Sequence, residues 1–140
     1  MANWLIPCNP TYYDVFSAFR TLKTVDWRQT AKNITAGDTV YIYTSKPVQA
    51  ITHKCVVLSS DIPSENVDNS DAQFYIIQSD QRRALPSHWR YMRLQLVKEY
   101  VSNAITYSEI LDCGLKGSLQ GQRHIWPLLQ DAIDSADNDV

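Results

Sequence analysis

The chain has 140 residues, a formal net charge of −2, and hydrophobic residues at 44% of its positions. These values are typical of one soluble globular domain with a substantial core. Its three cysteines are widely spaced, which argues against a disulfide framework and against a structural zinc site. No secretory signal and no apolar run of about 20 residues is visible, so we expect a cytoplasmic protein that binds no membrane, metal or cofactor.

The first part of the chain predicts a strand, a helix and a loop. Residues 3–8 (NWLIPC) form an apolar run typical of a buried strand. In residues 10–23, apolar side chains recur at helical spacing behind a capping-box pair, Thr11 and Asp14. Residues 24–30 (TVDWRQT) are polar and are expected to form a loop around a tryptophan.

The middle of the chain predicts strands separated by turns and by an acidic loop. Residues 36–58 read as a turn, a strand, a break at Pro47 and a second strand. The composition of residues 59–71 predicts a loop, followed by a strand over residues 73–78. Residues 90–100 alternate apolar and polar side chains, as a half-buried strand does.

Two helices are predicted near the end of the chain. Residues 106–114 carry Thr106 and Glu109 in capping-box register, and Gly114 is placed to end the helix. The last helix tolerates Pro127 because this proline falls in its first turn. The side chains expected on its packing face are Ile125, Leu128, Leu129, Ala132 and Ile133.

The order of these elements predicts the fold class and the domain organisation. The strands are short and do not repeat a βαβ unit, which favours an α+β fold over a doubly wound sheet. We expect a small twisted β-barrel of about five or six strands flanked by helices. One domain is expected over residues 1–134, with an acidic tail or the start of a linker at residues 135–140.

Charge is distributed unevenly along the chain. Nine of the 15 acidic residues lie in segments 59–80 and 131–140, which contain no lysine or arginine, so the other residues carry a net charge of +7. A field of this sign can attract phosphates. The alternative is that these basic residues only solvate the surface.

Motifs for catalysis and for nucleotide binding are absent from the sequence. In KGSLQGQRHIWP (residues 116–127) the spacing from Gly117 to Gly121 is one residue too short for a P-loop, and a predicted helix rather than a strand precedes the loop. What remains is either a simple turn or a weak anion site at Arg123 and His124. The three histidines lie in different elements and no nucleophile motif occurs, so we expect no enzyme.

Two tryptophans stand in polar, loop-like settings and are each followed by an arginine. These pairs are Trp27-Arg28 and Trp89-Arg90. Such a tryptophan either fills the core or stacks on a planar base while the neighbouring cations contact phosphates. The spacing alone leaves both interpretations open.

Short motifs in the first third of the chain resemble the EVE domain, which belongs to the PUA-like group of small barrels and is related to YTH domains. The family's opening Trp-Leu and its Ser-Glu-Pro are similar to Trp4-Leu5 and Cys8-Asn9-Pro10. Its next tryptophan, its Gly-Asp turn and its Tyr-x-Ser are similar to Trp27, Gly37-Asp38 and Tyr43-Thr44-Ser45. The change from Ser-Glu to Cys-Asn alters the polar groups that a base would meet.

The resemblance implies a protein that reads a modified base by flipping it into an aromatic pocket. The NWLIPCNP and GSLQG segments resemble the subgroup fused to HNH nucleases in modification-dependent restriction enzymes, where the domain reads modified cytosine. The implied partners are modified double-stranded DNA and an HNH-type nuclease domain. A reader of modified RNA is the first alternative, and a small-molecule-binding or scaffolding module is the second.

The resemblance and the residue chemistry together imply two sets of site residues. The base pocket is expected from six side chains: Asn9, Trp27, Gln29, Tyr43, Ser45 and Trp89. The nucleic-acid backbone is expected to contact another six: Arg28, Arg90, Lys116, Ser118, Gln120 and Arg123.

Overall fold

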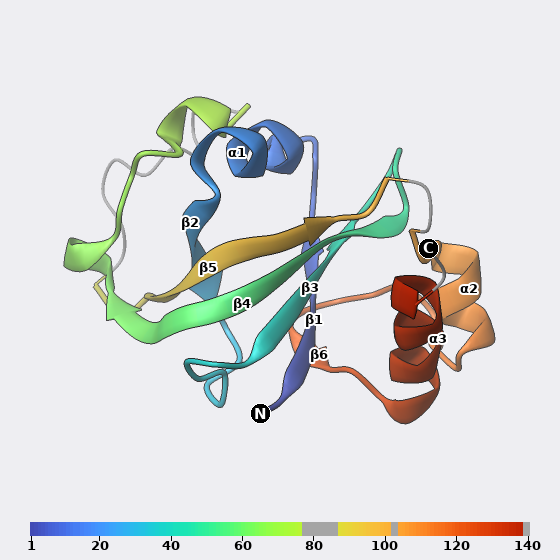
Figure 1. Ribbon diagram of the computed structural model, residues 1–140. Helices are drawn as coiled ribbons and strands as arrows, with labels where there is room; N and C mark the ends of the chain where they lie inside the picture. The colour runs from blue at the N-terminus through green and yellow to red at the C-terminus, as the bar shows by residue number, and fades with distance from the viewer. Residues whose placement is uncertain (77–86, 102–103, 139–140) are drawn as a thin grey trace.

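The computed structural model describes residues 1–76, 87–101 and 104–138, which form one sheet with helices packed on it (Figure 1). The helices are α1 (Val15–Leu22), α2 (Tyr107–Asp112) and α3 (Pro127–Asn138), with short 3₁₀ turns η1 (Ser64–Asn66) and η2 (Ala72–Phe74). The strands are β1 (Asn3–Cys8), β2 (Thr24–Gln29), β3 (Thr39–Thr44), β4 (Ala50–Pro63), β5 (Arg90–Glu99) and β6 (Arg123–His124).

The six strands form a single mixed sheet in the order β2-β5-β4-β3-β1-β6. Strands β1 and β3 are parallel, and every other pair in the sheet is antiparallel. This confirms the predicted α+β class with six strands flanked by helices. In the described residues the sheet is not closed into a barrel, because the edge strands β2 and β6 do not pair and β6 has only two residues.

Both faces of β1 and β3 are buried, which explains their nearly continuous apolar sequences. One face packs on α1, in a cluster that includes Ile6, Phe19 and Ile42. The other face packs on α2 and α3, in a cluster that includes Leu5 and Tyr43. Alternation along a strand sends successive side chains to opposite faces, so both clusters are built from the same two strands. In Figure 1, α1 lies on one side of β1, and α2 and α3 lie together on its other side.

A buried carboxylate fixes the chain between β1 and β3. Asp38 is 4% exposed and accepts hydrogen bonds from the Trp4 indole at 2.9 Å, the Ala2 amide at 3.0 Å and the Thr35 amide at 3.1 Å. Burial by itself would raise the pKa of Asp38, but these hydrogen bonds outweigh it and hold the pKa below its usual value. The carboxylate therefore remains charged and satisfied inside the protein.

Two predicted loops are strands in the structure. Residues 24–30 were expected to form a loop, but Thr24–Gln29 is β2, paired in register with β5. Its polar residues suit an edge strand, and Asp26 accepts two hydrogen bonds from the Arg93 guanidinium at 2.8 and 2.9 Å. The loop expected from residue 59 begins later, because β4 continues to Pro63 through irregular pairing.

Two further local predictions are corrected. The strand expected over residues 73–78 is replaced in its described part by η2 and by an isolated bridge between Tyr75 and Tyr13, while residues 77–78 lie outside the described residues. The cap of α1 is Asp14, whose side chain accepts from the Ser17 amide, and not the pair with Thr11. The amide of Thr11 instead donates to the side chain of Asn9.

The predictions near the end of the chain are confirmed in part. Leu129 and Ile133 are buried on the packing face of the last helix as expected, but Leu128 is 62% exposed and Ile125 precedes the helix. Thr106 and Glu109 form the reciprocal capping box of α2, and Gly114 follows that helix with φ of 111°. Helix α3 begins at Pro127 and continues to Asn138, so the first residues of the expected tail are helical. Among the described residues, no helix has the length and apolar character needed to cross a membrane.

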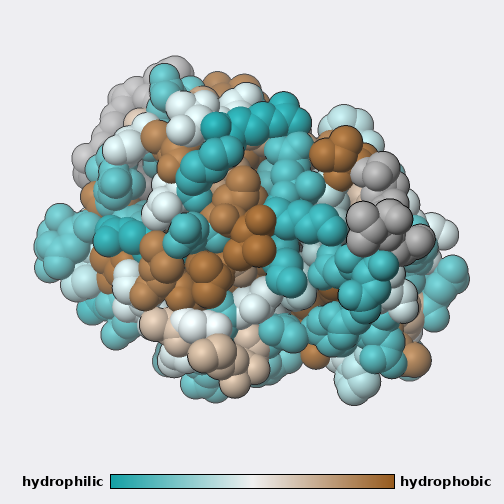
Figure 2. Space-filling view, in the orientation of Figure 1, coloured by the Kyte–Doolittle hydropathy of each residue, from teal (hydrophilic) through white to brown (hydrophobic). Residues whose placement is uncertain are grey.

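An apolar patch lies over the middle of β4 and β5. In the view of Figure 1 none of the described helices covers the central part of these two strands, and Figure 2 shows the patch over them. The large apolar side chains exposed on these two strands are Leu58 and Val97.

A buried histidine lies between α1 and the sheet. His53 is 0% exposed, its Nδ1 is 2.7 Å from Thr52 Oγ1, and its Nε2 is 3.8 Å from a Glu99 carboxylate oxygen. The rings of Phe16 and Phe19 pack against it. Burial lowers the pKa of His53 to about 4, and the nearby Glu99 charge opposes this shift only in part.

We expect the free energy of unfolding to fall as the pH is lowered from about 6.5 to about 4. In this window the unfolded chain takes up a proton at His53 while the folded protein does not, so protonation favours unfolding. Across this window the free energy of unfolding should fall by about 3 kcal/mol, since each unit of difference in pKa corresponds to about 1.4 kcal/mol. Urea unfolding at closely spaced pH values measures it. The His53→Gln variant should lose this part of the pH dependence, and an unchanged profile would contradict the assignment.

Candidate nucleic-acid interface

The candidate site lies where the parallel strands β1 and β3 end side by side. Cys8 is paired with Thr44 at these ends, and the Ser45 amide donates to the Cys8 carbonyl at 2.9 Å. Asn9 and Ser45 are therefore the first side chains beyond the two strands. Ligands of sheets with parallel strands commonly bind outside such carboxyl ends.

An aromatic cavity of about 240 Å³ opens beside Asn9. The residues that line this aromatic cavity are Pro7, Cys8, Asn9, Tyr12, Tyr13, Trp27, Arg28 and Tyr75. Its aromatic side chains come from the segment after β1, from β2 and from the segment after η2. The lining is thus mainly apolar and aromatic, with polar groups at Asn9 and Arg28.

Ring contacts and a hydrogen bond hold the aromatic walls in place. The Tyr13 ring lies edge-on to Trp27 with centroids 5.6 Å apart, and edge-on to Tyr75 at 4.7 Å. The Tyr13 hydroxyl donates to the carboxylate of Asp71 at 2.7 Å. Edge-to-face packing is a favoured arrangement of aromatic rings. The cavity therefore has preformed walls, and Tyr12, at 45% exposure, lies at the rim.

A polar cavity of about 510 Å³ lies on the other side of Asn9. Its lining is made by Asn9, Thr11, Tyr43, Ser45, Lys46, Gln49, Tyr107, Ser118 and Leu119. The Tyr107 hydroxyl donates to the Gly117 carbonyl at 2.6 Å and so holds the loop that carries Ser118. Burial, and to a smaller extent Tyr107, raises the pKa of Tyr43, so its hydroxyl stays protonated and can donate.

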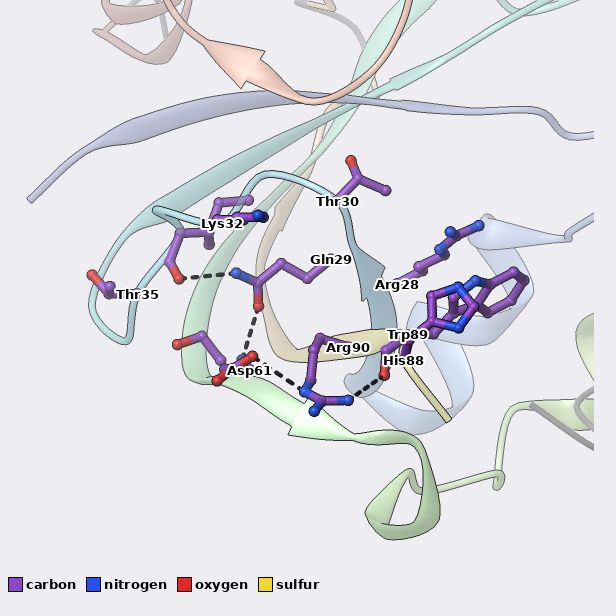
Figure 3. A pocket seen from close by; sticks show the side chains of 11 residues that line it. Arg28, Gln29, Thr30, Lys32, Thr35, Asp61, His88, Trp89 and Arg90 are labelled. Atoms are coloured by element: carbon purple, nitrogen blue, oxygen red, sulfur yellow. Dashed lines mark hydrogen bonds and ion pairs between the residues drawn. The ribbon is translucent and has the colours of Figure 1, made fainter. Parts of the chain in front are cut away.

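A basic cavity of about 620 Å³ lies beyond Arg28 (Figure 3). It is lined by Arg28, Gln29, Thr30, Lys32, Ile34, Thr35, Ser60, Asp61, His88, Trp89 and Arg90. The Arg28 guanidinium carbon lies 3.6 Å from the centroid of the Trp89 ring, close enough for a strong cation–π contact. Arg28 also lines the aromatic cavity, so the two cavities share this side chain.

The three cavities form a row joined by two shared side chains. Asn9 connects the polar cavity to the aromatic cavity, and Arg28 connects the aromatic cavity to the basic cavity. The six residues predicted for one base pocket are distributed along this row. Asn9 and Trp27 line the aromatic cavity, Tyr43 and Ser45 the polar cavity, and Gln29 and Trp89 the basic cavity.

The side-chain amide of Gln29 holds the loop that follows β2. Its Nε2 donates to the carbonyls of Ala31 at 2.9 Å and Ile34 at 3.2 Å, and its Oε1 accepts from the Asp61 amide at 2.9 Å. Both ends of the amide are thus bonded to the backbone. Gln29 shapes the basic cavity rather than presenting a free hydrogen-bonding edge.

The residues predicted to contact the nucleic-acid backbone lie in three places. Ser118 lines the polar cavity, with the exposed Gln120 amide 3.3 Å from its hydroxyl, and Arg28 and Arg90 line the basic cavity. Lys116 and Arg123 instead line a separate cavity of about 280 Å³ beside Trp126, where the Arg123 guanidinium carbon is 4.6 Å from a ring centroid of that tryptophan.

The sequence predictions missed a residue that connects two distant loops. The Gln122 side chain accepts from the amides of Thr30 at 2.8 Å and Ala31 at 3.1 Å, and donates to the Arg28 carbonyl at 2.8 Å. It therefore fixes the backbone where the basic cavity begins. No local pattern indicates these contacts, because Gln122 and Thr30 are 92 positions apart. The tyrosine and lysine side chains of the three cavity linings that the sequence predictions also missed are Tyr12, Tyr13, Lys32, Lys46, Tyr75 and Tyr107.

The thiol in the aromatic cavity is unsuited to nucleophilic chemistry. Burial raises the pKa of Cys8 to about 12, so the thiol stays protonated near neutral pH and packs as a small apolar group. Within residues 1–76, 87–101 and 104–138, no group of three or more His, Cys, Asp or Glu side chains is arranged to hold a metal ion.

Comparison with known proteins places the fold. No protein-family model matches the chain, and no curated protein is similar to it in sequence. The crystal structure of ASCH from Zymomonas mobilis is similar in fold, with a TM-score of 0.68 and 9% sequence identity. The superposition covers 96% of this chain and 94% of the ASCH chain. A protein from Agrobacterium tumefaciens has a TM-score of 0.59 and 11% identity over 97% of this chain and 93% of its own.

A third similar structure contains nucleic acid. Human THYN1, in complex with DNA containing 5-methylcytosine, has a TM-score of 0.52 and 13% identity, and covers 80% of this chain and 74% of its own. At sequence identities this low, the similarity to these structures establishes the fold alone. The chain has a PUA-like fold, as the sequence motifs predicted, and its place in the EVE subgroup stays a prediction.

Proposed function

We propose that this protein is a nucleic-acid-binding reader that accepts a modified base in the aromatic cavity. The observation that carries the proposal is the row of cavities, in which an aromatic cavity lies between a polar one and a basic one. A nucleotide presents the matching groups in one molecule, since its base is planar and apolar on its faces and its phosphates are anionic. The proposal assigns no catalytic step to this chain.

Stacking on the aromatic walls would supply much of the binding free energy. Trp27 is half-buried and held by the Tyr13 ring, so little freedom is lost when a base packs against it. A stacked base contributes about 1–3 kcal/mol. Extruding a base from a duplex costs a few kcal/mol, so selective contacts must add to stacking before a flipped base is favoured.

Asn9 is suited to recognise the edge of that base. Its side-chain oxygen accepts from the Thr11 amide at 2.9 Å, which orients the amide group. Among the described residues no acceptor is bonded to its NH₂ group, which stays available to donate to a carbonyl oxygen or a ring nitrogen of a base. This donor is the chemical consequence of asparagine standing where the EVE family has glutamate.

Modified cytosine in double-stranded DNA is the base that we propose. The Cys8 and Pro7 side chains give the cavity apolar wall next to Asn9, which suits a methyl group on the ring. The human relative in fold, whose structure contains 5-methylcytosine DNA, supports this choice. We further propose that the protein serves as the specificity module of a modification-dependent restriction system, with cleavage supplied by an HNH-type nuclease domain.

A binding panel tests the function. Fluorescence anisotropy would be measured with labelled duplexes that carry one central 5-methylcytosine, 5-hydroxymethylcytosine or cytosine, and with matched single strands and RNA. We expect 5-methylcytosine to be preferred over cytosine by about fourfold or more, since a buried methyl group contributes about 0.8 kcal/mol. Equal affinity for all bases would contradict the reader function, and a preference for modified RNA would favour that alternative.

Salt dependence separates a nucleic-acid ligand from a small neutral one. Affinity for DNA should fall steeply as salt rises, with a logarithmic slope of about −0.7 to −0.9 for each phosphate contacted. Binding that is insensitive to salt would instead indicate the small-molecule or scaffolding alternative.

A further inference from the structure

The basic cavity combines cationic and hydroxyl side chains around an open space. In Figure 3, Lys32 and Thr30 lie on the side of this space opposite Arg90, and Arg28 lies beside Trp89. Thr35 and Ser60 add further hydroxyl groups to the lining. Lysine, arginine and hydroxyl groups are the side chains that most often contact phosphate oxygens.

The cations of this cavity are largely uncompensated. Among the described residues, neither Arg28 nor Lys32 has a carboxylate partner. The acidic side chain in the lining, Asp61, is 79% exposed and lies 3.5 Å from Arg90. Three cations against one carboxylate leave the cavity with a net positive charge, which favours an anionic ligand.

Arg28 is placed between this cavity and the proposed base site. Its guanidinium carbon lies over the Trp89 ring, 3.6 Å from the ring centroid. This contact restricts the position of the side chain, and guanidinium N–H groups remain that can donate to an anion. Gln122 and the backbone of β2 fix the main chain at the same point. An anion that contacts Arg28 therefore lies directly next to whatever occupies the aromatic cavity.

The charges on the two sides of the aromatic cavity are unequal. The basic cavity contributes Arg28, Lys32 and Arg90, whereas Lys46 is the cation among the residues that line the polar cavity. A strand whose base enters the aromatic cavity would thus meet most of the positive charge on one side of that base.

We infer that the basic cavity is a subsite for the phosphodiester group that joins the accepted nucleotide to its neighbour on one side. Lys32 and Arg28 contact this phosphate, and Arg90 supports the charge of the cavity. The inference rests on the proposed function and adds to it a polarity: the protein grips one flank of the modified base more strongly than the other.

Neutral linkages placed on single flanks test this inference. Duplexes with a central 5-methylcytosine would carry one methylphosphonate, which lacks the phosphate charge, either 5′ or 3′ of that base. We expect one of the two substitutions to lower affinity about tenfold and the other to have a much smaller effect, because a hydrogen bond to a charged group contributes more than a neutral one. Equal effects on the two flanks would overturn the inference.

Charge variants identify the protein side of the contact. Lys32→Gln should lower affinity for the all-phosphodiester duplex about as much as the methylphosphonate on the sensitive flank lowers the affinity of the wild type. When the duplex already carries that methylphosphonate, Lys32→Gln should lower affinity little further. Lys98→Gln makes the same charge change at a lysine that lies near Asp137 and lines none of the cavities, so it should leave affinity nearly unchanged. Equal losses in both variants would overturn the assignment.

The outcomes separate this inference from the proposed function. If 5-methylcytosine is preferred but neither flank nor Lys32 matters more than its control, the subsite is wrong and the reader function stands. If modified and plain duplexes bind alike while one neutral flank still weakens binding, the subsite stands and the reader function fails. If no duplex binds, both are overturned.

Discussion

Replacing Trp27 by alanine is expected to weaken binding of a modified duplex about 5- to 150-fold and to remove the preference for the modified base. The reason is that Trp27 forms a wall of the aromatic cavity, and loss of a stacked base–aromatic contact costs about 1–3 kcal/mol. Anisotropy titrations with modified and plain duplexes measure both effects.

A conservative variant controls for damage to the fold at this position. Trp27 also packs against the core, so Trp27→Ala will lose some stability as well as the wall. Trp27→Phe keeps an aromatic face and should retain most of the preference for the modified base. If Trp27→Ala still folds by circular dichroism and still discriminates, the base does not enter the aromatic cavity.

Replacing Asp38 by alanine is expected to lower the free energy of unfolding by about 3 kcal/mol or more. The change leaves three donors without their acceptor, on Ala2, Trp4 and Thr35, and an unsatisfied buried donor costs about 1–3 kcal/mol. Urea unfolding at pH 7 measures the loss. Because the pKa of Asp38 is lowered, the stabilisation is present above its unfolded value of 3.8 and is lost as the pH falls through the folded pKa.

Two further variants define what the Asp38 result means. Asp38→Asn keeps one acceptor oxygen, so its free energy of unfolding should lie between those of the wild type and Asp38→Ala. Asp131→Ala, at an exposed position of α3, should change stability by no more than about 0.5 kcal/mol. A loss in Asp38→Ala no larger than that in Asp131→Ala would show that the hydrogen bonds to this carboxylate contribute little.

Local signals in the sequence identified most helices and central strands. The capping box of Thr106 and Glu109 and the glycine stop at Gly114 depend only on residues within one turn of α2, and the structure confirms them. The apolar runs of β1 and β3 likewise required burial, whatever packed on them.

Segments whose structure depends on a distant partner were misassigned. Nothing local in TVDWRQT indicates a strand, because its polar side chains are stabilised by β5, for example by Arg93 bonding to Asp26 across 67 positions. The end of β4 was missed similarly, since its acidic, irregular residues pair with the start of β5. A polar edge strand and a polar loop have the same composition.

The sequence by itself determined the kinds of side chain available for a site: paired tryptophans and arginines, an asparagine after the first strand, and basic charge outside two acidic segments. Only the tertiary structure decided that Asn9 and Arg28 each join two cavities, and that Gln122 ties the glycine-bearing loop to β2. The physical reason is the distance along the chain over which each kind of interaction acts. Backbone preferences act over a few residues, whereas a cavity is formed by side chains that folding brings together, such as Tyr13 and Asp71, 58 positions apart.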